Sequence, residues 1–217
     1  MPATMLGMKI GLVDYGAGNL QSVRNALRAI GRDSVLAASE EDLAGVDALI
    51  FPGVGAFGDS MRHLHEQGLA GPLRAWIRGG RPFLGICIGY QVLFESSEES
   101  PGVEGLGVFA GEVTRIKADG LKVPHMGWNE AVFTHPADPL WAGLGPAPHV
   151  YFVHSYHPNP ADKTLTAATT EYGAPFASAI RWESGAAVQF HPEKSQAIGL
   201  RLLENFLTVS EARLAAP

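Results

Sequence analysis

The most informative segment of the sequence is Gly85-Ile86-Cys87-Ile88-Gly89-Tyr90-Gln91, residues 85–91, which holds the only cysteine among 217 residues. The apolar run Pro82-Phe83-Leu84 before them predicts a buried strand, and the apolar run Val92-Leu93-Phe94 after them predicts a helix. Cys87 is therefore expected at a strand-to-helix junction, in the pattern G-x-C-x-G. Flanking glycines permit the strained turn that presents a nucleophile, and the start of a helix favours a thiolate. A buried structural cysteine is the alternative that this pattern alone leaves open.

Strands and helices alternate in the first half of the chain. Apolar runs predict strands, and apolar residues at helical spacing predict helices. The expected strands are Lys9–Asp14, Ser34–Ala38, Ala48–Phe51 and the run into Cys87, and the expected helices are Leu20–Ile30 with Asn19 as its cap, Gly58–Gln67 and Leu69–Arg78. Such alternation indicates a mainly parallel sheet flanked by helices. Ligands of these sheets bind at the carboxyl ends of strands, here the loops 16–19, 52–55 and 87–91.

The second half of the chain is rich in short β segments. The expected strands are Val108–Ile116, Trp128–Phe133, His149–His154, Leu165–Thr170, Ala177–Glu183 and Ala186–Phe190, followed by a helix from about Ser195. They suggest an antiparallel β section joined to the same sheet, so the predicted fold class is α/β. We see no linker and expect a single domain over residues 1–217. Residues 1–8 lack the features of a signal peptide and are expected to form a disordered extension.

Composition excludes several classes of function. With 46% hydrophobic and 18% charged residues, the chain is typical of a soluble globular protein. Its net charge of −6 and lack of a Lys/Arg cluster argue against a nucleic-acid partner. No apolar run is long enough to span a membrane. A single cysteine excludes an internal disulfide, which suits a reducing cytoplasm.

Cofactor motifs are broken or absent. The third glycine of G-x-G-x-x-G after the first strand is replaced by Gln21, and no P-loop sequence occurs. His154 and His157 have no second cysteine to complete a zinc pattern. We therefore expect neither a metal nor a cofactor.

A cysteine nucleophile needs a base and a group that orients the base. His191 and Glu193 follow the last predicted strand, and residues i and i+2 of an extended chain point to the same side. Glu193 would then orient His191, and His191 would reach Cys87 from a neighbouring strand end. The alternative is a histidine at the core edge beside a solvated glutamate.

The segment around Cys87, residues 85–91, together with Phe190-His191-Pro192-Glu193, resembles the triad (class I) glutamine amidotransferases. The similarity runs from about Lys9 to Phe206. Further segments are similar to one branch, the glutaminase subunits of imidazole glycerol phosphate synthase. They are Asp14-Tyr15-Gly16-Ala17-Gly18-Asn19, Pro52-Gly53-Val54-Gly55-Ala56-Phe57, Pro124-His125-Met126-Gly127-Trp128-Asn129, Tyr151-Phe152-Val153-His154-Ser155-Tyr156 and His191-Pro192-Glu193-Lys194-Ser195. The sequence shows no departure from the family pattern at a catalytic position.

The resemblance implies a role for each matching residue. Cys87 would be the nucleophile on glutamine, His191 the base and Glu193 its orienting partner. The oxyanion would be held by the N–H of Ile88 and by one from Gly53-Val54-Gly55. Glutamine would be bound by Gln91, Glu99, Ser155 and Tyr156. Glu95 and Glu98 compete with Glu99 for the amino group, and the sequence leaves that choice open.

The resemblance also implies a partner, a (β/α)8-barrel cyclase subunit that forms a heterodimer with this chain. It would use the ammonia to make imidazole glycerol phosphate and AICAR in histidine biosynthesis. Independently, one domain leaves no room for an acceptor site, and free ammonia would protonate in water. The interface candidates are Asn19, Met126, Trp128, Tyr151 and Lys194, with core packing as the alternative for Met126 and Trp128. Lys194 is expected to face away from Glu193.

Three rival functions remain at this point. Another triad amidotransferase with a different ammonia acceptor would share the triad residues. A stand-alone cysteine hydrolase is disfavoured by Gln91 and by Ser155-Tyr156, and a non-catalytic binding module by the presence of Cys87, His191 and Glu193.

Overall fold

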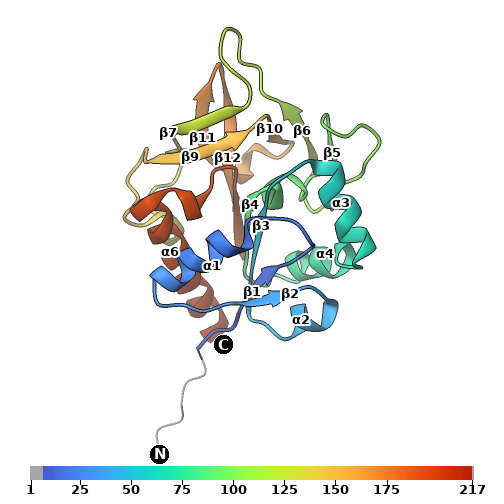
Figure 1. The fold of residues 1–217 in the computed structure, drawn as a ribbon. Helices are drawn as coiled ribbons and strands as arrows, with labels where there is room; N and C mark the ends of the chain where they lie inside the picture. Colours follow the sequence, from blue (N-terminus) through green and yellow to red (C-terminus); the bar gives the residue numbers. More distant parts are fainter. Residues whose placement is uncertain (1–6, 217) are drawn as a thin grey trace, which may run out of the picture.

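The computed structural model describes residues 7–216, and its centre is an eight-stranded sheet in the order β2-β1-β3-β4-β13-β12-β11-β8 (Figure 1). Neighbouring strands from β2 to β13 pair in parallel, and those from β13 to β8 pair in antiparallel fashion. The parallel strands are β1 (Ile10–Val13), β2 (Val35–Ala37), β3 (Ala48–Gly53), β4 (Phe83–Cys87) and β13 (Gly185–Val188). The antiparallel extension comprises β8 (Val132–Phe133), β11 (Thr166–Tyr172) and β12 (Ala174–Trp182).

Helices cover both faces of the sheet, because the strand side chains that alternate between the faces are apolar on both. In β3, Ala48 and Ile50 belong to one hydrophobic cluster, and Leu49 and Phe51 belong to another. The first cluster is closed by α1 (Leu20–Ala29) and α6 (Gln196–Ala215), and the second by α2 (Glu40–Ala44), α3 (Phe57–Glu66) and α4 (Ala70–Arg78). In Figure 1 the first pair lies to the left of the sheet, and α3 and α4 lie to the right.

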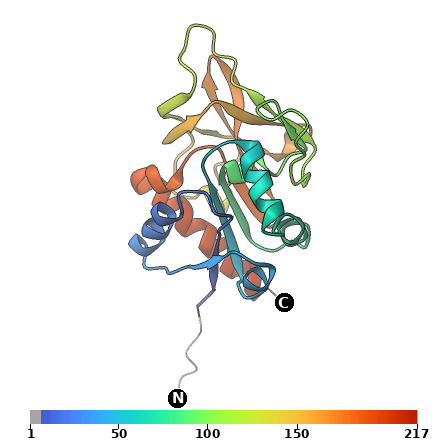
Figure 2. The same cartoon turned by 45° about the vertical axis from the view of Figure 1, so that its right-hand side comes forward.

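Two smaller sheets lie beyond the carboxyl ends of β3 and β4, at the top of Figures 1 and 2. One has the order β10-β6-β5, and the other pairs β7 with β9 in antiparallel fashion. Their strands are β5 (Ser96–Ser97), β6 (Gly111–Arg115), β7 (His125–Glu130), β9 (His149–His154) and β10 (Tyr156–Pro160). Three short 3-10 turns complete the structure: η1 (Pro139–Trp141), η2 (Lys163–Leu165) and η3 (Pro192–Lys194).

The predicted α/β fold class is confirmed, including the mainly parallel sheet and the added antiparallel β section. Several details differ. Only β8, β11 and β12 of the antiparallel section join the central sheet. The last parallel strand ends at Val188, before the predicted Phe190. Neither α2 nor β10 was predicted from the sequence.

The helix after Cys87 is much shorter than predicted. α5 spans only Ile88–Gln91, and residues 92–94 leave the helix. The carbonyl of Val92 accepts the N–H of Leu106, and that of Phe94 accepts the N–H of Gly107. These carbonyls are therefore used by a distant segment of the chain and not by a further helical turn.

Three further observations concern the start of the chain, the start of α1 and the length of the helices. Residues 1–6 of the expected extension lie outside the described residues, while Met8 packs against the hydrophobic core. Asn19 occupies the N-cap position of α1, but its side chain makes no capping hydrogen bond. Within residues 7–216, no helix combines the length and apolarity that crossing a bilayer requires.

Candidate active site

Cys87 is held at a strained turn between β4 and α5. Its backbone angles are φ 54° and ψ −107°, a combination that side-chain-bearing residues rarely adopt. The turn depends on close backbone approaches: a Cβ at position 85 would lie 2.5 Å from the carbonyl oxygen of Gly89, and one at position 89 would lie 2.0 Å from that of Phe51. Both flanking residues must therefore be glycine, and the thiol is left 6% exposed.

His191 and Glu193 form a buried pair. The Nδ1 of His191 lies 2.8 Å from Oε1 of Glu193, and both side chains are 1% exposed. The extended geometry predicted for them at the end of the last strand is wrong, because β13 ends at Val188 and Glu193 lies in the turn η3. Two hydrogen bonds hold the turn against β9: His191 donates its backbone N–H to the Tyr151 carbonyl, and Tyr151 donates its backbone N–H to the Ser195 hydroxyl. The contact between the pair is thus produced by a turn and not by strand alternation.

The environment of His191 favours its protonated form. Burial disfavours the charge, but interaction with Cys87 and with Glu193 outweighs burial and raises the pKa of His191 to about 10. Glu193 is also approached by the Asn19 amide, whose Nδ2 lies 3.5 Å from Oε1. The Nε2 of His191 has no hydrogen-bond partner among residues 7–216, so it is available to a reacting group in the cavity that it shares with Cys87.

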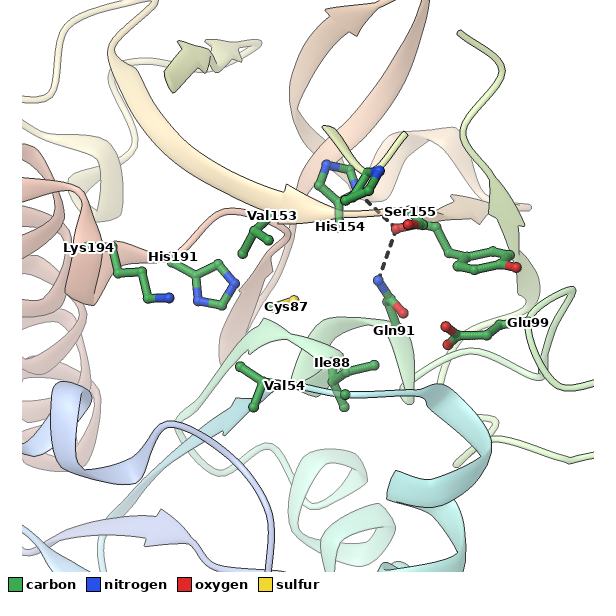
Figure 3. A pocket seen from close by; sticks show the side chains of 13 residues that line it. Val54, Cys87, Ile88, Gln91, Glu99, Val153, His154, Ser155, His191 and Lys194 are labelled. Atoms are coloured by element: carbon green, nitrogen blue, oxygen red, sulfur yellow. Dashed lines mark hydrogen bonds between the residues drawn. The ribbon is translucent and has the colours of Figure 1, made fainter. Parts of the chain in front are cut away.

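A cavity of about 390 Å³ brings most of the predicted residues together. Figure 3 shows Cys87 between His191 and Lys194 on one side and Glu99 on the other. The lining residues are Val54, Gly55, Cys87, Ile88, Gln91, Glu99, Pro124, Val153, His154, Ser155, Tyr156, His191 and Lys194. Of the residues predicted to bind glutamine or its oxyanion, Gly53 alone is absent from this lining; it is buried at the end of β3.

The three neighbouring glutamates that the sequence could not separate have different surroundings. Glu99 lines the cavity, and its Oε2 accepts the backbone N–H of Phe57 at 2.7 Å. Glu95 accepts the N–H of Gly111, and Glu98 accepts that of Arg115. Neither Glu95 nor Glu98 lines the cavity, so only Glu99 can offer a carboxylate to a ligand there.

Two residues near Cys87 or in the cavity, Gln189 and His154, were not predicted as site residues. The Nε2 of Gln189 lies 3.6 Å from Cys87 Sγ, and Gln91 Nε2 donates to Gln189 Oε1. His154 also lines the cavity. The sequence carried a signal for His154, which directly precedes Ser155, but Gln189 is brought to the thiol only by the pairing of β13 with β4.

Four of the predicted interface residues, Met126, Trp128, Tyr151 and Lys194, lie on β7, β9 and η3. Met126 is 62% and Trp128 47% exposed, so the core-packing alternative for them is wrong. Trp128 pairs across the sheet with Tyr151, and the Lys194 ammonium lies 5.7 Å from the centre of the Tyr151 ring. Lys194 also lines the cavity beside His191, contrary to the extended geometry predicted for it.

Metal ligands do not gather anywhere in the described part of the chain: no three His, Cys, Asp or Glu side chains are arranged to hold an ion.

Comparisons with known proteins agree on the family. Residues 11–209 match the family described as "Glutamine amidotransferase class-I". "Imidazole glycerol phosphate synthase subunit HisH" of Microcystis aeruginosa is 46% identical over 200 residues, covering 91% of this chain and 94% of the relative. The protein of the same name from Aquifex aeolicus is 46% identical over 205 residues, covering 94% and 98%.

Solved structures show the same fold at lower identity. A structure described as a glutamine amidotransferase has a TM-score of 0.73 at 24% identity, covering 93% of this chain and 98% of that one. PurLQS from Thermotoga maritima has a TM-score of 0.71 at 16% identity, covering 94% and 99%. These likenesses concern the fold, and the sequence relationships decide the family. The chain belongs to the class-I glutamine amidotransferases and, within them, to the HisH subunits of imidazole glycerol phosphate synthase.

Proposed function

We propose that Cys87, His191 and Glu193 act as a triad that hydrolyses glutamine to glutamate and ammonia. The Sγ of Cys87 attacks the carboxamide carbon, and His191 protonates the departing ammonia as the C–N bond breaks. Water then attacks the thioester, His191 takes its proton, and glutamate leaves as the C–S bond breaks. The observation that carries the proposal is the strained Cys87 sharing one cavity with the buried His191–Glu193 pair.

The cavity has suitable groups for the rest of the substrate. Glu99 would pair with the amino group of glutamine, because its carboxylate lines the cavity. Gln91, Ser155 and Tyr156 line the same cavity and would hold the remaining polar atoms. The N–H of Ile88, at the start of α5, and one from residues 53–55 would stabilise the oxyanion.

We further propose that the ammonia passes to a (β/α)8-barrel cyclase subunit, with which this chain forms a heterodimer in the cytoplasm. That subunit would produce imidazole glycerol phosphate and AICAR for histidine biosynthesis. The names of the 46% identical relatives, which are subunits of a synthase, support a complex. The exposed Met126 and Trp128 beside the cavity support its location, because large apolar side chains left in solvent are typical of interfaces. Asn19, Tyr151 and Lys194 would belong to the same contact.

The test is a glutaminase assay on the purified chain, alone and with the cyclase and its nucleotide-like ligand. Glutamate release that depends on glutamine and rises when the cyclase and ligand are present would support the proposal. A chain that forms the complex and yet releases no glutamate would overturn it.

A further inference from the structure

A chain of buried hydrogen bonds connects strand β7 with the candidate active site. His125 on β7 and His154 on β9 are cross-strand partners, and Nδ1 of His125 lies 3.1 Å from Nε2 of His154. Both residues are buried, at 3% and 6% exposure. Only His154 lines the cavity, so His125 acts on the cavity through its partner.

The acceptor at one end of this series of hydrogen bonds determines which ring nitrogens of His125 and His154 carry a hydrogen. The Nδ1 of His154 lies 2.9 Å from the carbonyl oxygen of Tyr156, which can only accept, so this nitrogen must carry the hydrogen. A neutral imidazole has one N–H, which leaves Nε2 of His154 as an acceptor. The Nδ1 of His125 must therefore donate to it, and Nε2 of His125 then accepts from the Asn129 amide at 3.3 Å.

Burial supports the neutral state that this argument requires. It lowers the pKa of His125 to about 4 and that of His154 to about 3. A second proton on His154 would sit on Nε2 and face the Nδ1–H of His125. A second proton on His125 would sit on its Nε2 and face the N–H that the Asn129 amide donates. Both histidines are thus fixed in the Nδ1–H tautomer at neutral pH.

The same Tyr156 carbonyl oxygen joins the histidines to the nucleophile. It also accepts Gln91 Nε2 at 3.0 Å, and Figure 3 shows the two bonds that meet there as dashed lines. Gln91 donates in addition to Gln189, whose own amide lies 3.6 Å from Cys87 Sγ. The position of this carbonyl therefore fixes Ser155-Tyr156 and Gln91 relative to Cys87.

We infer that His125 and His154 are positioning residues for the glutamine substrate. Their paired Nδ1–H tautomers hold the Tyr156 carbonyl, and with it the positions of Ser155 and Tyr156 on one side of the cavity and of Gln91, which donates to this carbonyl, on the other. His125 touches no part of the cavity, and its effect on substrate passes entirely through His154. This inference rests on the proposed glutaminase function for its kinetic consequence, but not for the proton positions.

The proton positions are tested first, on the unaltered chain and without substrate. Long-range ¹H–¹⁵N NMR spectra distinguish the two nitrogens of each ring and show which one carries the proton. We expect Nδ1–H for both histidines at pH 7, whereas a free neutral histidine prefers Nε2–H. An Nε2–H tautomer or a doubly protonated ring at either position would overturn the inference. This measurement remains valid if the proposed function fails or if a variant does not fold.

The kinetic test uses two substitutions of His125 that separate hydrogen bonding from packing. The His125 ring stacks on Tyr172, with centroids 4.0 Å apart, and on Phe152 at 4.7 Å. His125→Phe keeps an aromatic ring there but removes the donor, whereas His125→Asn keeps an N–H at the position of Nδ1 but removes the ring. If the hydrogen bond positions the substrate, His125→Phe should raise the KM for glutamine about tenfold, the order expected for a buried group that loses its partner. Its kcat should fall much less, and His125→Asn should keep a KM close to that of the wild type.

A matched control tests the packing alternative. Tyr172→Phe keeps the ring that stacks on His125 and loses only the hydroxyl bond to the Lys122 carbonyl. Its KM should stay at the wild-type value. A KM that rises more in His125→Asn than in His125→Phe, or one that is unchanged in both, would overturn the inference. Loss of turnover without a change in KM would do the same.

Discussion

The two walls of the cavity are built in different ways. One wall, the parallel wall, lies at the ends of parallel strands: Cys87 ends β4, and His191 follows β13, the strand that pairs with β4. The opposite wall, the antiparallel wall, comes from β9 and β10, which each pair with an antiparallel neighbour, and Ser155 lies between these two strands. The first wall is set by strand pairing and by glycines that admit close backbone contact. The second depends on hydrogen bonds between side chains that are distant in the sequence.

This difference suggests how the chemical and binding tasks are divided. Cys87 and His191, which would break bonds, lie at the end of β4 and shortly after the end of β13, two paired strands in the buried sheet, where displacement is costly. Ser155 and Tyr156, which would hold the substrate, follow directly after β9, and the strand paired with β9 is β7, which carries the exposed Met126 and Trp128. Changes in the parallel wall should therefore act on kcat, and changes in the antiparallel wall on KM or on association.

The strongest test of the parallel wall is Cys87→Ala. Without the sulfur no thioester can form, so glutamine turnover should fall by at least about 10⁴-fold. The measurement is glutamate release by the complex at saturating glutamine. As a control, the variant complex should still run the cyclase reaction with added ammonium salt. Wild-type glutaminase activity in Cys87→Ala would remove the parallel wall from the chemistry.

Unequal losses are expected from the buried pair on the same wall. His191→Ala should reduce kcat by about four to six orders of magnitude, because base and nucleophile act as a unit. Glu193→Gln keeps the shape and an acceptor oxygen beside Nδ1 of His191, so the loss should be at least about tenfold smaller. Single-turnover kinetics of both variants would measure the two losses. Equal losses would mean that Glu193 does more than orient the imidazole.

The buried histidines of the antiparallel wall predict sensitivity to acid. An unfolded histidine binds its proton near pH 6.5, but folded His125 does so only near 4 and His154 only near 3. Below pH 6.5 the unfolded chain therefore binds more protons, and the stability that is present above this pH is lost as the pH falls toward 4. His157, whose pKa burial also lowers, adds to this loss, whereas His191, whose pKa is raised, loses its contribution only as the pH rises.

The expected loss between pH 7.5 and pH 4.5 is on the order of 2–5 kcal/mol in the free energy of unfolding. Urea unfolding at several pH values would measure it, with His125→Asn as the matched variant that lacks one titrating ring. The decline should be less steep in that variant. The same decline in both proteins would mean that His125 does not titrate on unfolding.

A smaller effect is expected from the strain at Cys87. Cys87→Gly relieves the unfavourable φ of 54°, and Cys87→Ala does not. The relief of about 1–3 kcal/mol exceeds the added entropy of an unfolded glycine, so the glycine variant should be more stable than the alanine variant by about 1 kcal/mol. Thermal unfolding of the two inactive variants gives the comparison directly. An alanine variant of higher Tm would show that the elbow is not strained.

The smallest change is predicted for Lys194→Ala, at the rim between the two walls. Its exposed ammonium lies near the Tyr151 ring, and an exposed charge contributes little to binding. Affinity for the cyclase should fall about two- to fivefold, and the difference should shrink as salt is added. Calorimetry at low and high ionic strength would measure it. If the wild type and Lys194→Ala bind the cyclase with equal affinity at both ionic strengths, Lys194 does not contribute to the interface and is an ordinary solvated side chain.

The sequence predicted the parallel wall better than the antiparallel one, for physical reasons. The glycines around Cys87 and the apolar strand before it are local signals, so the elbow could be found without knowledge of the fold. β10 was missed because Pro158 and Pro160 argue against a strand, yet β10 lies at a sheet edge and pairs only with β6, where proline is tolerated. The His125–His154 contact could not be predicted, because it depends on the register between β7 and β9.

The solitary thiol of Cys87 has a practical consequence for anyone who handles the protein. Because the sequence contains no second cysteine, a thiol-directed reagent has one destination, and the number of equivalents consumed counts intact nucleophiles in a preparation. The rate of that labelling would report how freely a small molecule enters the cavity, with and without a bound partner. Storage in air would lower this count, because oxidation of the sulfur beyond the sulfenic acid is irreversible. The active fraction of each preparation would then fall without a change in protein concentration.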